Sequence, residues 1–445
     1  PLSHSFESRT TYQGNVRIPS MRLLLLNTGP IATLSSHNVE TPLTGEDMSD
    51  KESLCLEGGQ GILVSEGTVQ NISQSEELLH EYGKDEDSNL RVYDCKGKAI
   101  IPGFVDCHTH LVWGGDRANE MQLRHSGLTY TDIAERGGGI QKTVDFTRSM
   151  PSSRLVQLGK KRIARALKFG STTIECKSGY GLSVDSELKL LEINQSLGQN
   201  TPMDIHSTWL GAHDVPKDLN IEDYVDNLIS EQLPAVIEQG YAHYADVFCE
   251  PGWFSLEQTE EIVKAAEKHG LPSRLHVDEF VDGNGLQLAS DLGVISGDHV
   301  GHSSDDARHS ASNSGTMQTF LPGTPYVLGH DLDSPLRKCI ENNWQFSLAT
   351  DFNPNCRSLS MPFVGSLATH RLGLSPLEAL VAVTRNPAST LAKSTQGPIP
   401  GSIREGGPAD FLILDSEHID AWCQMPGDNP VHQTVKAGVL LSYNQ

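Results

Sequence analysis

Residues 102–110 read Pro-Gly-Phe-Val-Asp-Cys-His-Thr-His, which places two histidines one residue apart directly after a run typical of a buried β-strand. Residues i and i+2 of a strand point to the same side. Two imidazoles aimed together from one strand end supply half of a metal site, because zinc binds histidine nitrogens at about 2.0 to 2.1 Å. A complete site requires further ligands from elsewhere in the chain.

Beyond residue 100, apolar β segments alternate with helix-length amphipathic segments, a pattern typical of parallel βα units. The strands are predicted at 100–106, 172–177, 204–209, 244–249, 273–277, 294–298, 316–321 and 345–350. Helices are predicted at 155–169, 183–197, 222–239, 256–269 and 376–384, the last with Ser375 as its N-cap. Eight such strands predict an α/β fold with a (β/α)8 TIM-type barrel over 100–396.

Short strand-like pieces occur near both ends of the chain. They lie at 23–26, 61–64, 91–93, 409–414 and 435–441. We expect residues 21–99 and 397–445 to form one small composite β-sandwich domain, in which the polar stretches 35–60 and 71–90 are long surface loops. Residues 1–20 are polar without periodicity and are predicted to be a flexible N-terminal extension.

The composition narrows the class of partner. With 34 basic and 57 acidic side chains the net charge is −23, which disfavours nucleic acid and acidic membrane surfaces. The apolar run 23–26 is far shorter than the roughly 18 residues that cross a bilayer, and no signal peptide is recognisable. Eight cysteines without Cys-x-x-Cys spacing indicate a reducing, cytoplasmic location. We expect a small-molecule substrate, no nucleic acid and no membrane.

In such a barrel, functional residues gather where the strands end. His276 lies in the fifth predicted strand, His299 at the end of the sixth and Asp351 at the end of the eighth. Taken singly, each histidine is more often a packed or surface residue, and Asp351 could be a turn residue. Their joint placement with His108 and His110 predicts one divalent metal site. The other histidines considered, His206, His269, His309 and His418, are interpreted as structural.

The chain resembles the amidohydrolase superfamily of metal-dependent barrels and, within it, the imidazolonepropionase family of histidine breakdown, over about residues 21–441. The His-x-His pair and the aspartate of the eighth strand are common to the superfamily. The sequences Lys-Ser-Gly-Tyr-Gly-Leu at 177–182 and Leu-Gly-Ala-His at 210–213 resemble the narrower family. The resemblance also implies a homodimer.

The resemblance implies that His108, His110, His276 and Asp351 hold one zinc or iron ion. This ion would activate a water molecule and polarise the ring carbonyl. Glu279 would relay a proton from the water to the departing ring nitrogen. His299, and perhaps His213, would orient the water or stabilise the oxyanion. Glu279, His299 and Asp351 are therefore the predicted catalytic residues.

The substrate implied by the resemblance is 4-imidazolone-5-propanoate, whose ring opening yields N-formimidoyl-L-glutamate. Arg117 would bind its propionate through paired charge-assisted hydrogen bonds. The other predicted substrate contacts are Tyr180, His213, Glu279, Asn353, Asn355 and Cys356. At the last two positions many family members carry Gly followed by Ser or Thr. Asn355 tolerates the left-handed backbone, but the hydroxyl contact does not transfer to Cys356.

Two alternatives stay open at this point, a deaminase and a noncatalytic scaffold, while a third, a two-metal cyclic amidase, is disfavoured. An amidohydrolase-type deaminase of an aromatic base such as cytosine or guanine would use the same metal residues, although Arg117, Tyr180 and the Leu-Gly-Ala-His piece favour a carboxylate-bearing ring. A two-metal cyclic amidase should carry a bridging lysine on the fourth strand, and residues 244–250 contain none. A noncatalytic barrel scaffold should have lost ligands, and ranks last.

Overall fold

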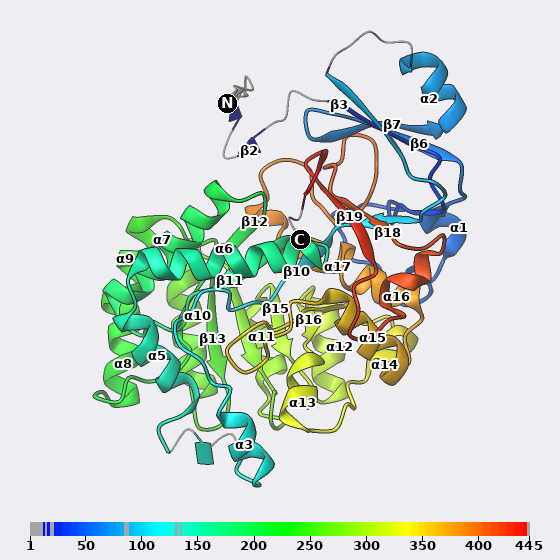
Figure 1. The fold of residues 1–445 in the computed structure, drawn as a ribbon. Coiled ribbons are helices and arrows are strands. Elements are labelled where there is room, and N and C mark those ends of the chain that lie inside the picture. Colours follow the sequence, from blue (N-terminus) through cyan, green and yellow to red (C-terminus); the bar gives the residue numbers. More distant parts are fainter. Residues whose placement is uncertain are drawn as a thin grey trace, which may run out of the picture.

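The protein folds into a barrel and two smaller sheets. The computed structural model describes residues 12–13, 16–17, 22–83, 89–129, 132–133 and 136–442. Figure 1 shows the barrel below and the sheets formed by the two chain ends above it. The predicted extension 1–20 lies outside the described residues, except for β1 (Tyr12–Gln13) and β2 (Val16–Arg17), which pair antiparallel.

Eight parallel strands form the barrel, each paired with the next in sequence, which confirms the predicted fold class. They are β10 (Phe104–Asp106), β11 (Ser171–Lys177), β12 (Asp204–Ala212), β13 (Tyr244–Cys249), β14 (Ser273–Val277), β15 (Ser296–His299), β16 (Met317–Phe320) and β17 (Phe346–Leu348). A parallel bridge between Thr109 and Phe352 joins the ends of the first and last strands.

The predicted first strand, 100–106, is wrong as a single element. Ile100–Pro102 (β9) belongs to a small sheet, where it pairs with β18 (Phe411–Leu414). The chain enters the barrel only after Gly103. A Cβ atom on Gly103 would lie 2.3 Å from the Thr172 hydroxyl oxygen, so this close crossing between sheets requires glycine.

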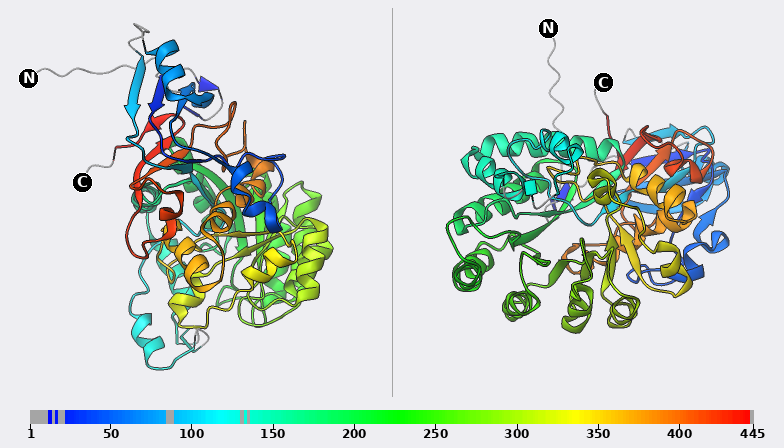
Figure 2. Two further views of the ribbon diagram at one scale, coloured as in Figure 1. Left: turned by 90° about the vertical axis from the view of Figure 1, so that its right-hand side faces the viewer. Right: turned by 90° about the horizontal axis from the view of Figure 1, so that it is seen from below.

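Helices surround the barrel, as the view onto its lower end in Figure 2 shows. In chain order they are α3 (Glu120–His125), α5 (Gly139–Ser149), α6 (Ser152–Lys168), α7 (Val184–Asn200), α8 (Ile221–Asn227), α9 (Leu233–Gln239), α10 (Leu256–Lys268), α11 (Gly285–Leu292), α12 (Asp305–Ser314), α13 (Gly323–Leu328), α14 (Leu336–Glu341), α15 (Met361–Arg371), α16 (Pro376–Ala382) and α17 (Arg385–Ser389). The predicted N-cap Ser375 is confirmed, because it forms a capping box with Glu378. The predicted helix 222–239 is interrupted by a π-helical turn at Leu228–Gln232, just before Pro234, which lacks a backbone donor.

The two small sheets pack face to face as a sandwich. The six-stranded sheet contains β20 (Val439–Leu440), β19 (Val431–Lys436), β18, β9, β4 (Ile31–Ala32) and β5 (Cys55–Leu56), and the four-stranded sheet contains β7 (Thr68–Gln74), β6 (Gln60–Ser65), β3 (Arg22–Leu26) and β8 (Leu90–Asp94). Leu25 and Ile62 of one sheet share a buried cluster with Ile100 and Phe411 of the other. Both chain ends therefore contribute to one core.

The polar stretches predicted as long surface loops contain regular structure instead. Residues 35–60 include α1 (Lys51–Leu54), a 3-10 turn (Gly45–Met48) and β5, and residues 71–90 include most of β7 and α2 (Ser75–Tyr82). Leu78 is fully buried in a cluster with Leu24, Leu26 and Leu63. Leu78, with the partly buried Tyr82 packed against the same cluster, holds α2 on the sheet. The acidic composition of the segment hides this anchor.

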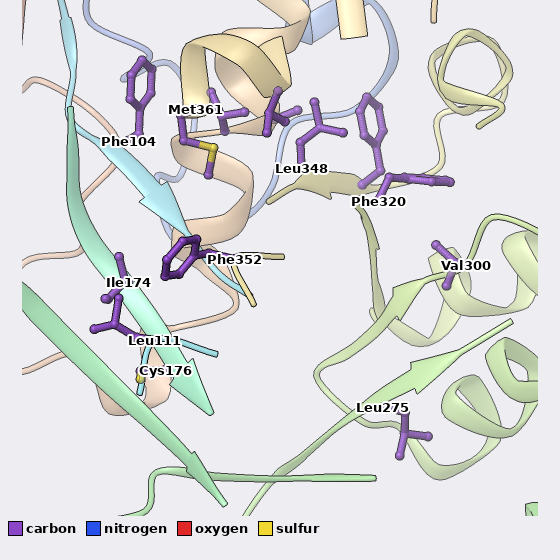
Figure 3. Packing of buried hydrophobic residues seen from close by; sticks show 14 of the residues in the cluster. Phe104, Leu111, Ile174, Cys176, Leu275, Val300, Phe320, Leu348, Phe352 and Met361 are labelled. Atoms are coloured by element: carbon purple, nitrogen blue, oxygen red, sulfur yellow. The ribbon is translucent and has the colours of Figure 1, made fainter. Parts of the chain in front are cut away.

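The main core lies between the barrel strands and their helices. Figure 3 shows Phe104, Ile174, Leu275, Phe320 and Leu348, all fully buried members of this core. Their packing fixes the strand ends that carry the candidate site. Among the described residues, none of the helices combines the length and the apolar character needed to span a bilayer.

Candidate metal centre

The predicted ligands converge at the carboxyl ends of the barrel strands. His108 and His110 follow β10, His276 lies in β14, and Asp351 follows β17. All four are buried. In Figure 1 this end of the barrel is the lower one, marked by α3 and α13, which follow β10 and β16.

The donor atoms of these residues face one another. Nε2 of His110 lies 3.4 Å from Nε2 of His276. Oδ1 of Asp351 lies 3.6 Å from Nε2 of His108 and 3.7 Å from Nε2 of His110. Ligand atoms about 2.0–2.1 Å from a tetrahedral ion are themselves separated by about 3.3–3.4 Å. The spacing therefore fits one shared divalent ion.

Two aspartates fix the tautomers of two of these histidines. Nδ1 of His108 lies 2.7 Å from Asp298 Oδ2, and Nδ1 of His276 lies 3.0 Å from Asp246 Oδ1. An ionised carboxylate only accepts, so each Nδ1 carries the proton and each Nε2 presents a lone pair. Nε2 of His108 is buried and has no hydrogen-bond partner among the described residues. Burial lowers the pKa of His108 well below its usual value, which favours the neutral, ligating form.

Beneath these aspartates lies a buried lysine that the sequence analysis gave no role of its own. Lys177, at the end of β11, is completely buried against Asp246 and Glu175. Burial alone would lower the pKa of Lys177, but Asp246 and Glu175 outweigh it and raise the pKa above its usual range. The signal for this network was charged residues inside segments that otherwise read as buried strands.

Glu279 and His299 stand beside the ligand group. Nε2 of His299 lies 3.7 Å from Oε2 of Glu279, whose side chain is 13% exposed. Burial, then the charges of Asp351 and Glu250, raise the pKa of Glu279 well above its usual value. Burial lowers the pKa of His299 and keeps its imidazole neutral. His299 also forms, with His108 and His276, a second group whose ligand atoms lie within 4.8 Å of one another.

A threonine that the sequence analysis missed completes the surroundings of Asp351. The Thr324 hydroxyl donates to Oδ2 of Asp351, which leaves Oδ1 toward the histidines. Asp351 has a φ of 48°, a left-handed conformation that few residues other than glycine, asparagine and aspartate adopt readily. The sharp turn at the end of β17 thus aims this carboxylate into the barrel mouth.

Tyr180 and His213 form one wall next to the ligands. The His213 ring stacks on His110 with centroids 5.0 Å apart, and Nδ1 of His213 donates to the Gly179 carbonyl at 2.9 Å. Gly179 has a φ of 86°, and a Cβ atom there would lie 2.8 Å from that nitrogen. The buried Glu187 accepts from the amides of Gly179, Gly181 and Leu182, which holds this loop in place. Burial lowers the pKa of His213 to about 3.

Arg117 faces the same cavity from the segment after β10. Its side chain is buried, and its Nε and Nη2 donate to Oε2 of Glu120 at 2.9 and 2.7 Å. The other oxygen of Glu120 accepts from the Gly139 amide, at the start of α5. The Gly137-Gly138-Gly139 run therefore leads into a helix that helps to hold this arginine.

Of the predicted residues in the loop after Asp351, two line the cavity and one does not. Asn353 and Asn355 line the cavity, and Oδ1 of Asn353 accepts from the amides of Asn355 and Cys356. Cys356 is fully buried behind them with its thiol 3.6 Å from the Thr350 carbonyl, and it does not line the cavity. The structure thus brings together every predicted site residue except Cys356.

One cavity connects the ligand group with these walls. Its lining comprises Arg117, Ile140, Tyr180, His213, Phe248, His276, Glu279, Phe280, His299, Thr324, Leu328, Asp351, Asn353 and Asn355. The apolar members were not predicted, because nothing in their sequence surroundings separates them from core residues. A cavity with cationic, carboxylate and aromatic walls suits a small, polar, ring-shaped molecule.

Comparisons with known proteins show which families this chain is similar to. Residues 160–441 match the amidohydrolase family. The chain is 40% identical to the imidazolonepropionase of Symbiobacterium thermophilum, over 88% of this chain and 91% of that protein. It is 36% identical to the imidazolonepropionase of Alkaliphilus metalliredigens, over 94% and 97%. An adenosine deaminase from Xanthomonas campestris with bound zinc is similar in fold, with a TM-score of 0.67 and 14% identity over 94% of this chain and 92% of that one.

Proposed function

We propose, because this chain belongs to the imidazolonepropionases of the amidohydrolase family, that it hydrolyses the ring C–N bond of 4-imidazolone-5-propanoate to N-formimidoyl-L-glutamate in histidine catabolism. The observation that carries the proposal is a single cavity lined by Arg117, two of the candidate metal ligands and Glu279. It offers a cation for the propionate and a hydrolytic group for the ring.

The amidohydrolase family is metal-dependent, and the histidine-rich group can hold an ion. We propose one zinc or iron ion bound by His108, His110, His276 and Asp351. A divalent ion in this position supplies Lewis-acid polarisation of the ring carbonyl and lowers the pKa of water. The protein contributes the fixed, neutral imidazoles and the carboxylate that hold it.

Glu279 is the proposed proton carrier. Its raised pKa makes the carboxylate a good acceptor for a proton from the attacking water, and the acid formed can deliver that proton to the leaving ring nitrogen. His299 lies within 4 Å of this carboxyl group and is kept neutral by burial, so it can orient the water or donate to the oxygen that gains charge.

His213 is better suited to binding the substrate than to stabilising an oxyanion. Its Nδ1 proton is used on the Gly179 carbonyl, and a pKa of about 3 leaves Nε2 without a proton. An acceptor of this kind matches an N–H of the imidazolone ring, whereas an oxyanion needs a donor. Tyr180, 5.2 Å away between ring centroids, would close the same wall.

The proposal predicts which small molecule is turned over. We expect the purified protein to open imidazolonepropionate well above the rate without enzyme, and to leave cytosine and guanine unchanged, since neither base carries the carboxylate that Arg117 would bind. Loss of imidazolone absorbance and release of ammonia from the bases measure the two reactions. Deamination of either base without ring opening would replace the proposal by the deaminase alternative.

Arg117→Gln should weaken use of the substrate. A charge-assisted hydrogen bond contributes about 1.5–3 kcal/mol, so kcat/KM should fall on the order of 10- to 100-fold, mostly through KM. The matched control is Arg357→Gln, since Arg357 is an exposed arginine paired with Asp116. The neutral amide of the propionate is the second substrate. An equal loss on acid and amide would contradict carboxylate binding by Arg117.

A further inference from the structure

We propose that Lys177 is a positioning residue for the metal centre, because its ammonium group bridges the two aspartates that orient His108 and His276. The inference rests on the metal site of the proposed function but not on the identity of the substrate. It assigns a role to Lys177, the first residue of the Lys-Ser-Gly-Tyr-Gly-Leu segment. Lys177 itself does not line the cavity.

The contacts of Lys177 lead to both histidines. Its Nζ lies 2.7 Å from Oδ2 of Asp246, whose other oxygen accepts a hydrogen bond from Nδ1 of His276. The same Nζ lies 3.8 Å from Oδ2 of Asp298, which accepts a hydrogen bond from Nδ1 of His108. One cation thus contacts the aspartate partners of two candidate ligands, His108 after β10 and His276 in β14.

A third contact of Lys177, through Glu175, leads to the backbone between the two histidines that follow β10. Nζ donates to Oε1 of Glu175 at 3.0 Å. The other oxygen of Glu175 accepts from the Thr109 amide at 3.3 Å, and the Thr109 hydroxyl donates to the Glu175 carbonyl at 2.7 Å. Thr109 separates His108 from His110, so this contact fixes the direction in which the pair leaves β10.

The burial of this group explains why one cation matters. Glu175, Lys177, Asp246 and Asp298 are each at most 1% exposed, so water cannot replace a lost partner. A buried carboxylate stays in place only when it is paired and hydrogen-bonded. Without the ammonium group, Asp246 and Asp298 lose the contact that holds their side chains under the imidazoles. The metal ligands then lose their fixed orientation.

The experiment compares Lys177→Met with Lys436→Met. Lys436 is a matched control, because it too is a buried lysine held by two aspartates, Asp204 and Asp410. Asp204 begins β12, whereas Lys177 ends β11, so the control lies toward the opposite end of the barrel. Both variants should lower the temperature of unfolding. The metal-free proteins are titrated with Zn²⁺ against a chelator, and with Co²⁺ while its visible absorption is recorded.

We expect Lys177→Met to bind Zn²⁺ about 10- to 100-fold more weakly, as for other groups that orient metal ligands, and to alter the Co²⁺ spectrum. Lys436→Met should keep both at their wild-type values. Equal Zn²⁺ affinity and an identical Co²⁺ spectrum in wild type and Lys177→Met would overturn the inference. Equal losses in both variants would also overturn it, because the effect would then be one of general stability.

A second variant covers a failure of Lys177→Met to fold. Lys177→Gln keeps hydrogen-bond donors but removes the charge, and the same weakening of Zn²⁺ binding is expected. Unchanged Zn²⁺ affinity in Lys177→Gln would overturn the inference. A wild-type protein that binds no Zn²⁺, Fe²⁺ or Co²⁺ would overturn the metal centre and this inference together. A wild-type protein that binds metal but opens no imidazolone ring would overturn only the proposed substrate.

Discussion

Glu279→Gln is expected to retain its metal and to lose about 10²- to 10⁴-fold in kcat, the usual contribution of a positioned proton carrier. The substitution is nearly isosteric and keeps the backbone amide that donates to Glu250. It removes only the ability of the side chain to take and release a proton. Metal content by elemental analysis and steady-state kinetics measure the two effects separately.

The control for this variant is Glu260→Gln, because Glu260 is a partly exposed glutamate on α10 that pairs with Lys264. It should behave as the wild type in both measurements. Full activity in Glu279→Gln would eliminate the relay. Loss of metal together with activity would instead assign Glu279 a role in holding the ion. This role is conceivable because His299, the neighbour of Glu279, belongs to a second possible metal-binding group with His108 and His276.

Removal of the divalent ion should abolish turnover. Lewis-acid activation is worth several kcal/mol, which corresponds to a loss of at least about 10³-fold. Activity should return with about one equivalent of zinc or iron per chain, and a comparison of the two ions in anaerobic titrations decides between them. Chelator-treated protein with full activity and no bound metal would contradict the proposed mechanism.

His110→Ala should resemble the metal-free protein even when metal is supplied. Its nitrogen lies 3.4 Å from that of His276, so its loss opens one corner of the ligand group. His206→Ala is the matched control, since His206 is also a buried histidine but lies within β12 and is hydrogen-bonded to Ser394, away from the cavity. The control should bind metal normally.

The barrel could be predicted from sequence because its signal is local and repeated. Most of the predicted strands contain short runs of apolar residues, and each helix has its own apolar periodicity, so each element is predicted independently of the others. The strand 100–106 shows the limit. Its residues are apolar as far as Val105, and only the crossing at Gly103, beside Thr172 from a distant part of the chain, divides it between two sheets.

The helix α2 is the opposite case, because regular structure forms where the sequence predicted a loop. Its acidic composition suggests a loop, and its stability depends on Leu78 entering a cluster built by β3 and β6. Partners far apart in sequence supply the burial, and no local pattern reveals them. Cys356 is a similar case, because adjacent residues of one loop face opposite ways, and Asn355 rather than Cys356 reaches the cavity.

By itself the sequence determined the class of fold and indicated the candidate metal ligands, because residue types and their places at strand ends carry that information. The candidate role of Arg117 came from the resemblance to a known family. Only the tertiary structure decided how these groups act. It joined Lys177, Asp246 and Asp298 into one buried network, and it set the tautomers of His108, His213 and His276. The physical reason is that hydrogen-bond direction and loss of water depend on atoms brought together from different strands, which no spacing along the chain encodes.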